Sequence, residues 1–174
     1  MVRIQTKRLL LRDHEPSDLE PYCKIESDPA YRWPEKVHPR AELERSFREA
    51  WLPPKVMGLL AAVFKPSGLY IGRCGLYPYR TDGGALVPNE ASIAFYLSRR
   101  YWGRGLATEA GSALVAHAFG ELGLSRIHAG VNADNMASIR VVEKLGFRYV
   151  RTGEGSGNRW HDFELVNPRW HTAA

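Results

Sequence analysis

Alternating hydrophobic and polar positions predict strands along much of this chain. The clearest case is 90–97, where one face of an extended strand carries Ala91, Ile93, Phe95 and Leu97. The opposite face carries Glu90, Ser92, Ala94 and Tyr96. Similar composition between turn residues predicts further strands over 3–11, 59–64, 69–76, 126–131, 147–152 and 159–166.

Helical periodicity and capping residues predict helices between these strands. An apolar stripe at helical spacing indicates a helix over 106–122, formed by Leu106, Ala110, Ala113, Leu114 and Ala118. Another helix is expected to begin after Asn135, a favourable N-cap, and to end at Gly146. Its mostly apolar face carries Met136, Ile139, Val142 and Glu143.

Two more helices are expected near the N-terminus, one after Asp18 and one over 39–51. Asp18 is the preferred cap because Pro21 then falls among the first amides, which need no partner within the helix. These elements predict an α/β (α+β) fold with a mixed central sheet flanked by helices. The length suits one domain, 1–174, whose folding buries roughly two-thirds of the surface of the unfolded chain.

Charge and cysteine content narrow the classes of function. The formal net charge of +5 suits an anionic ligand, but the basic residues form no run or motif typical of nucleic-acid binding. Cys23 and Cys74 have no metal-binding or redox spacing, so we expect a reducing cytoplasm and no metal. No stretch predicts a membrane span or signal peptide, so no membrane partner is expected.

The segment 99–110 is typical of a phosphate-binding turn. It runs from a strand end through Gly103 and Gly105 directly into the helix predicted over 106–122. Glycines let the backbone approach a ligand closely, and the first helix amides present unpaired N–H groups at the positive end of the dipole. Arg99, Arg100 and Arg104 add cations suited to phosphate oxygens.

Two motifs occur at a characteristic separation. Residues 101–110 read Tyr-Trp-Gly-Arg-Gly-Leu-Ala-Thr-Glu-Ala, and Asn-x-x-Ser at 135–138 is followed by Glu-Lys-Leu-Gly-Phe at 143–147. The pair resembles the GNAT acyltransferase superfamily, specifically its RimJ/RimL branch of ribosomal-protein N-terminal acetyltransferases. The resemblance begins at 6–12 and covers nearly the whole chain. It implies the GNAT acyl-CoA N-acyltransferase fold, with acetyl-CoA as the co-substrate.

The resemblance also implies where acetyl-CoA binds. Its phosphates are expected on the backbone of Trp102, Gly103, Arg104, Gly105, Leu106, Ala107 and Thr108. Its pantetheine arm is expected along the strand end formed by Leu97, Ser98 and Arg99, whose amides also suit the thioester oxygen. Asn135 matches a cofactor-contacting asparagine of the family, although a plain N-cap explains it equally well. Trp102 replaces the usual Gln or Arg, as is typical of the Rim-type branch.

The chain departs from the family pattern at its proton-transfer positions. Val142 replaces a common general-acid tyrosine, which leaves Ser138 or water as the candidate donor to the leaving thiolate. Ser92 replaces a common glutamate, so Glu90, one repeat earlier on the same face, is the candidate base acting through water. An exposed carboxylate without a catalytic role also explains Glu90. A weak base suits an α-amine, of pKa ~7.7–8.0, better than a lysine, of pKa ~10.4.

We therefore expect an N-acetyltransferase in which a primary amine attacks the acetyl-CoA thioester directly. The acceptor is left open between a protein N-terminus, an amino acid, a polyamine and an aminoglycoside-like antibiotic. Trp33, in an aromatic loop over 28–34, and Tyr96 are the candidate substrate-binding residues, although Trp33 could instead fill a gap in the core. The departures at Val142 and Ser92 leave a CoA-binding protein with little catalytic activity as the alternative.

Large aromatic side chains on the outer elements favour a homodimer. These are Trp51, Trp160 and Trp170, which exceed what the packing of those elements requires. Nucleic acid is expected as a partner only through a ribosomal substrate.

Overall fold

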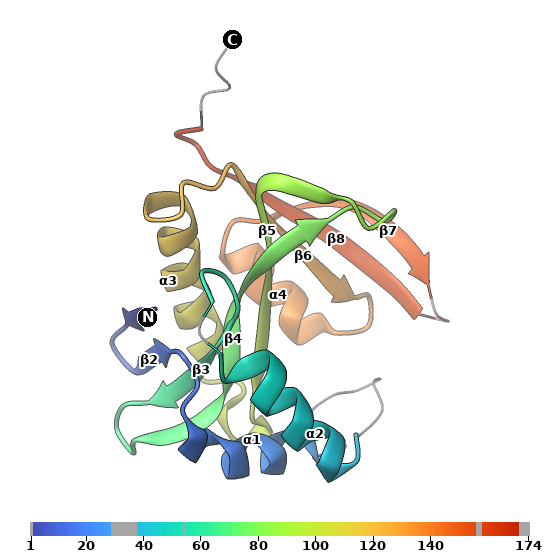
Figure 1. The fold of residues 1–174 in the computed structure, drawn as a ribbon. Coiled ribbons are helices and arrows are strands. Elements are labelled where there is room, and N and C mark those ends of the chain that lie inside the picture. Colours follow the sequence, from blue (N-terminus) through green and yellow to red (C-terminus); the bar gives the residue numbers. More distant parts are fainter. Residues whose placement is uncertain (1, 29–37, 54, 156–157, 171–174) are drawn as a thin grey trace. The chain divides into compact units, whose positions relative to one another are not determined.

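The computed structural model describes residues 2–28, 38–53, 55–155 and 158–170 (Figure 1). Its strands form a sheet in the order β1-β2-β3-β4-β5-β6-β8-β7. The β5–β6 pair is parallel, whereas the β1–β2, β2–β3, β3–β4, β6–β8 and β7–β8 pairs are antiparallel. The predicted mixed sheet with flanking helices is confirmed.

The chain divides into two compact units. The first comprises 1–75 and 95–113, and the second comprises 76–94 and 114–174. Three elements contribute residues to both units: β4 (Leu69–Arg80), β5 (Leu86–Leu97) and α3 (Leu106–Gly120). Among the described residues, no helix has the length and hydrophobicity needed to cross a membrane.

In the first unit, the second strand of an N-terminal hairpin pairs with β3 (Leu59–Phe64) in the sheet. The single strand expected over 3–11 is instead two strands, β1 (Arg3–Gln5) and β2 (Leu9–Arg12). Thr6 N donates to Leu9 O at 2.9 Å, and Leu9 N donates to Thr6 Oγ1 at 2.9 Å. These two bonds reverse the chain, so the expectation was wrong at this turn.

The helices of the first unit begin close to their predicted positions. A short 3₁₀ turn, η1 (Pro16–Asp18), leads into α1 (Leu19–Glu26), and α2 (Arg40–Ser46) continues into a π-helical turn, η2 (Phe47–Trp51). Asp18 precedes α1 as predicted. Its carboxylate, however, accepts hydrogen bonds from Glu15 N and the Arg12 guanidinium, and it makes no capping bond to α1.

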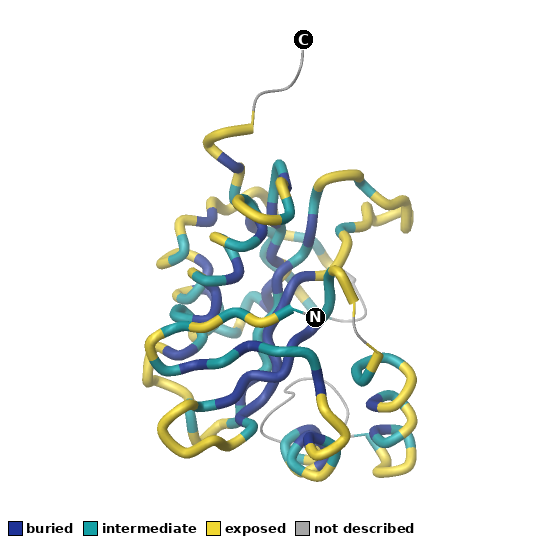
Figure 2. Tube along the Cα trace, turned by 60° about the vertical axis from the view of Figure 1, so that its left-hand side comes forward, coloured by how far each residue is buried: buried dark blue, intermediate teal, exposed yellow. Residues whose placement is uncertain are grey.

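The second unit packs apolar side chains on one face of its strands. In β6 (Arg126–Asn132), Ile127, Ala129 and Val131 are buried, whereas Arg126, His128 and Gly130 are less so. In α4 (Met136–Lys144), Ile139 and Val142 are buried, whereas Met136, on the same mostly apolar face, is 53% exposed. Met136 occupies the first turn of α4, next to the exposed Asp134. In Figure 2, buried positions gather along the central strands, whereas exposed positions are common on the outer loops.

The remaining strands of this unit form a C-terminal hairpin. It joins β7 (Arg148–Gly155) to β8 (Asn158–Val166), and β8 in turn pairs with β6 over 126–132. On the β5 side, β6 pairs only through 126–128, opposite 90–92.

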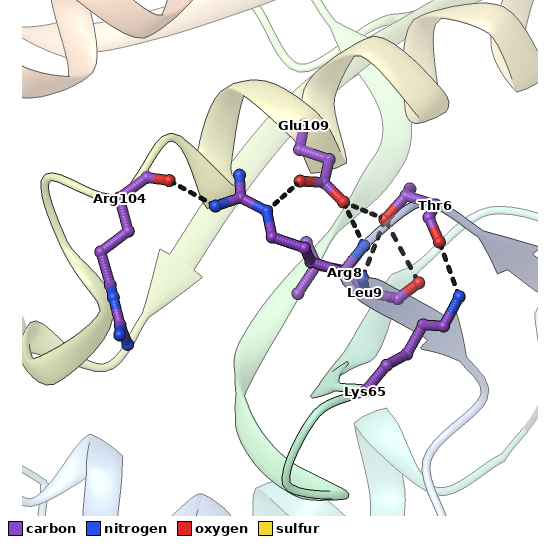
Figure 3. Close-up of polar contacts among 6 residues, drawn as sticks. All are labelled: Thr6, Arg8, Leu9, Lys65, Arg104 and Glu109. Atoms are coloured by element: carbon purple, nitrogen blue, oxygen red, sulfur yellow. Dashed lines mark hydrogen bonds and ion pairs between the residues drawn. The ribbon is translucent and has the colours of Figure 1, made fainter.

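A polar network connects the N-terminal hairpin of the first unit to the first turn of α3 (Figure 3). One carboxylate oxygen of Glu109 accepts from Thr6 Oγ1 at 2.5 Å and from Arg8 N at 2.6 Å. The other accepts from Arg8 Nε at 2.7 Å, and Arg8 Nη1 donates to Arg104 O at 2.9 Å. Burial raises the pKa of Glu109, but these hydrogen bonds outweigh it and lower the pKa below its usual value. Glu109 therefore stays ionised and holds the start of α3 in place.

We expect Glu109→Gln to lower the free energy of unfolding by about 2 kcal/mol, since hydrogen bonds to a charged carboxylate contribute that much. Arg8 is 38% exposed, so most of the loss should come from the bonds with Thr6 Oγ1 and Arg8 N. Urea denaturation at pH 7 measures it. The exposed Glu121→Gln is the matched control and should change stability by less than about 0.5 kcal/mol. Equal effects of the two substitutions would contradict this role for Glu109.

A second expectation concerns His14, a buried core residue of the first unit. Its Nε2 lies 3.0 Å from Leu59 O, and its ring contacts Phe47 and Tyr70. Burial lowers the pKa of His14 to about 4, from 6.5. Because the unfolded chain binds a proton at His14 more readily, this contribution to stability is complete above pH 6.5 and lost towards pH 4.

We therefore expect the stability advantage of the natural chain over His14→Gln to shrink by about 3 kcal/mol from pH 6.5 to pH 4. Glutamine can donate to Leu59 O but does not titrate. Chemical denaturation at several pH values measures the difference, and parallel losses in both proteins would show that His14 does not contribute.

Candidate active site

The segment predicted to bind phosphate forms a left-handed turn before α3. A short 3₁₀ turn, η3 (Arg99–Tyr101), follows β5, and Gly103 and Gly105 then adopt φ values of 69° and 73°. Residues with a Cβ are sterically disfavoured at such positive φ values, so glycine is favoured at both positions. The Gly-x-Gly pattern therefore meets a backbone requirement of the turn.

The amides of this turn are available to a ligand. The first hydrogen bond of α3 runs from Glu109 N to Gly105 O at 3.0 Å. The amides of Leu106, Ala107 and Thr108 precede that bond, and they have no backbone acceptor in the described part of the chain. A Cβ added at Gly103 would meet no atom within 4 Å, so space beside the backbone is open. This arrangement suits an anion at the positive end of the helix.

A cation beside the turn comes from a residue that sequence reasoning missed. Arg8 Nη2 lies 3.6 Å from the position that a Cβ on Gly105 would occupy, and Arg8 Nη1 donates a hydrogen bond to Arg104 O. The side chain of Arg104 points instead towards aromatic rings, 5.5 Å from Tyr101 and 5.8 Å from Phe64. Arg99 and Arg100 are exposed. Arg8 is 96 residues from Arg104, so no local pattern indicates the contact.

The strand end next to the turn is fixed by two hydrogen bonds. Ser98 N donates to Ile71 O of β4 at 2.7 Å. Because successive residues of a strand direct their backbone groups to opposite sides, the N–H and C=O of Leu97 point away from β4. Trp102 Nε1 donates to Leu97 O at 2.6 Å, so the tryptophan that replaces the usual Gln or Arg connects the turn to the strand end.

Two residues, Trp33 and Tyr96, were predicted to bind the amine substrate, and Trp33 lies outside the described residues. Tyr96 packs its ring 4.9 Å from the guanidinium of Arg73, which is buried, forms an ion pair with Glu26 at 3.1 Å and lies 4.4 Å from the Trp51 ring. Trp51 also donates from Nε1 to Tyr22 OH at 3.1 Å. Trp51 thus has packing partners within its own unit, which weakens its use as a sign of dimerisation. The acceptor role of Tyr96 stays a prediction.

In the second unit, Asn135 caps α4 as predicted. Its Oδ1 accepts from Ser138 N at 3.0 Å, while in the described residues its Nδ2 and the Ser138 hydroxyl have no hydrogen-bond partner. Ser138 is partly exposed one turn into the helix, whereas Val142 is buried. The side-chain NH₂ group of Asn135 and the hydroxyl of Ser138 are therefore available for a ligand at the start of α4.

Glu90 is not the exposed strand-start carboxylate that was considered above. Its Oε2 lies 2.5 Å from His128 Nε2, and its Oε1 lies 3.8 Å from Arg126 Nε. His128 is the register partner of Ser92 in the parallel β5–β6 pair. Sequence reasoning missed His128 because its partner lies 38 residues away.

The structure thus groups the predicted residues within each unit. In the first unit the strand end at 97–99 and the turn at 102–108 lie together. In the second, Asn135 lies beside Ser138, and Glu90 beside His128. The described residues contain no group of three His, Cys, Asp or Glu side chains able to hold a metal ion.

Comparison with known proteins identifies the family. A family model described as an acetyltransferase (GNAT) domain matches residues 8–148. An uncharacterized N-acetyltransferase, p20 of Bacillus licheniformis, is 29% identical over 154 residues, which cover 85% of this chain and 83% of that protein. Matches to some other curated relatives are shorter: the chain spans 54% of one Bacillus subtilis protein, at 33% identity over 96 residues.

Solved structures share the fold. A GNAT-family acetyltransferase from Bacillus anthracis has a TM-score of 0.82 at 20% identity, covering 95% of this chain and 99% of that one. A putative ribosomal-protein-serine acetyltransferase from Vibrio cholerae has a TM-score of 0.73 at 21% identity, covering 95% and 97%. With the family match over 8–148 and the predicted fold in place, the chain belongs to the GNAT family of acetyltransferases, enzymes that use acetyl-CoA.

Proposed function

We propose that this protein transfers the acetyl group of acetyl-CoA to a primary amine, with the phosphates of acetyl-CoA on the turn at 102–108. The observation that carries the proposal is the combination of two left-handed glycines, open helix amides and the Arg8 guanidinium at one place. The first amides of any α-helix are unpaired, so the support for a ligand comes from their position beside two left-handed glycines and a guanidinium. The pantetheine arm then follows Leu97, whose backbone N–H points away from β4.

The acceptor that fits best is an α-amine, as at a protein N-terminus. An α-amine of pKa ~7.7–8.0 is substantially neutral at pH 7, whereas a lysine of pKa ~10.4 is almost fully charged. The motifs at 101–110 and 135–147 resemble the RimJ/RimL branch, and this resemblance supports a peptide acceptor over a polyamine or an antibiotic.

Three proton transfers accompany the reaction. The amine nitrogen forms a bond to the thioester carbon, the carbon–sulfur bond breaks, and the thiolate leaves. Ser138, whose hydroxyl is free at the start of α4, supplies a proton to the thiolate and regains one from the new amide nitrogen. The acceptor ammonium loses its proton before attack, and Glu90 remains the residue predicted from the sequence to assist that transfer through water.

A thiol-release assay with acetyl-CoA and a panel of amines tests this function. The panel contains tripeptides beginning with serine or alanine, spermidine, kanamycin and free lysine. We expect turnover at pH 7 that is fastest with the tripeptides. CoA binding without thiol release from any amine would instead support a CoA-binding protein.

The phosphate site has its own expected outcome. Gly105→Ala should weaken CoA binding at least about tenfold, because a side chain at positive φ strains the turn by about 1–2 kcal/mol and displaces its amides. Gly68→Ala is the matched control, since Gly68 has a φ of 67° in the β3–β4 hairpin. It carries the same strain but should leave CoA affinity unchanged. Isothermal titration calorimetry measures both, and equal affinities of the two variants would reject the site.

The proton donor is tested by Ser138→Ala. Loss of a general acid should lower kcat by roughly ten- to a thousandfold and leave the KM for acetyl-CoA nearly unchanged. The exposed Ala137→Ser on the same helix turn is a control that should keep full activity. A kcat for Ser138→Ala within twofold of the natural chain at saturating acetyl-CoA would assign the proton to water.

A further inference from the structure

The less buried face of the second unit's strands carries a histidine–carboxylate pair. His128 Nε2 and Glu90 Oε2 are 2.5 Å apart, and both side chains are 18% exposed. The neighbouring Arg126 lies closer to Glu164, at 2.7 Å, than to Glu90, at 3.8 Å. The imidazole is therefore the principal partner of Glu90.

The imidazole ring is held in one orientation. Tyr79 of β4 stacks on His128 with ring centroids 3.6 Å apart and an angle of 13° between the planes. Glu90 fixes the Nε2 edge, and no hydrogen bond within the described ranges reaches Nδ1. When Nε2–H donates to Glu90, Nδ1 carries a lone pair that is free to accept a proton. The carboxylate then stabilises the imidazolium that forms, as in other base–carboxylate pairs.

We propose that His128 is the general base of this transferase and that Glu90 is its positioning residue. The inference deepens the proposed function and rests on it. His128 Nδ1 accepts one proton from the acceptor ammonium and frees the nitrogen lone pair for attack on the thioester carbon. After the carbon–sulfur bond has broken and the thiolate has been protonated, His128 returns its proton to solvent.

Other polar groups surround this pair and bear on its titration. From the strands packed beside His128, these are Glu90 and Ser92 of β5, Arg126 of β6, Glu164 of β8, and Tyr77 and Tyr79 of β4. The Arg126–Glu164 ion pair carries no net charge. Burial raises the pKa of Tyr77, against a smaller opposing effect of its hydrogen bond to Ser92. Tyr77 therefore stays neutral at the pH of the assay.

The test is the pH profile of kcat/KM, measured by thiol release with acetyl-CoA and the fastest amine of the panel above. With a histidine base, the acidic limb follows the imidazole and not the amine. In His128→Gln, which keeps a donor for Glu90, only amine that is already neutral can react. We expect kcat/KM to fall about a hundredfold at pH 7, the limb to move to the pKa of the amine, and activity to recover towards pH 9. Glu90→Gln should show a smaller loss, about tenfold.

His161→Gln on β8 is the matched control, because His161 bonds Thr152 and not Glu90. It should keep the profile of the natural chain, and CoA affinity should be unchanged in all three variants. A uniform loss across the pH range in His128→Gln, or turnover within twofold of the natural chain at pH 7, would overturn the inference.

The natural chain is decisive if the variants do not fold. An acidic limb that moves with the acceptor pKa, compared between two amines, would show that no enzyme base acts. If no amine releases thiol, the proposed function and this inference both fail. If thiol is released but the acidic limb of kcat/KM moves with the pKa of the acceptor, this inference alone fails.

Discussion

The ionised carboxylate of Glu109 is the constraint on which the predicted cofactor site depends. It lies in the first turn of α3, where the helix dipole favours negative charge, and it binds Thr6 and Arg8 of the N-terminal hairpin. Through Arg8 the same network reaches Arg104 O, in the middle of the left-handed turn. A turn with two glycines is conformationally free in isolation. Here its two sides are held by α3 and by Arg8, so its amides are organised before a ligand arrives.

The same network explains how a negative group can lie next to an anion site. Glu109 directs both oxygens at donors of the hairpin, and its charge is matched by the Arg8 guanidinium. The N–H groups of 106–108 are not used by this carboxylate and stay open. Trp102 completes the arrangement on the other side by bonding Leu97 O. Polar groups around the turn are thus divided between those that hold it and those left for a ligand.

Much of this arrangement could be predicted from sequence, because it depends on local patterns. Hydrophobic alternation locates β5, the Gly-x-Gly pattern locates the turn before α3, and Asn135 marks the start of α4. The prediction of one first strand failed because Thr6 forms a local turn with Leu9 and also bonds the distant Glu109. Helical spacing placed Met136 on the apolar face of α4 but could not show that this residue is exposed.

Two polar residues beside the predicted site were missed for the same reason. Arg8 and His128 each lie in an ordinary strand or turn segment, and only the tertiary fold brings them to Arg104 and Glu90. Periodicity can assign such residues to a face of a strand. It cannot say which charged group from another element meets them.

The central claim is that the open amides before and within the first turn of α3 receive the phosphates of acetyl-CoA. Backbone ¹⁵N–¹H NMR spectra recorded during titration with CoA measure this directly. We predict that the largest shifts fall on the amides of 103–108, with a smaller change at Leu97. Saturable binding that leaves those amides unshifted, and perturbs another part of the chain, would contradict it.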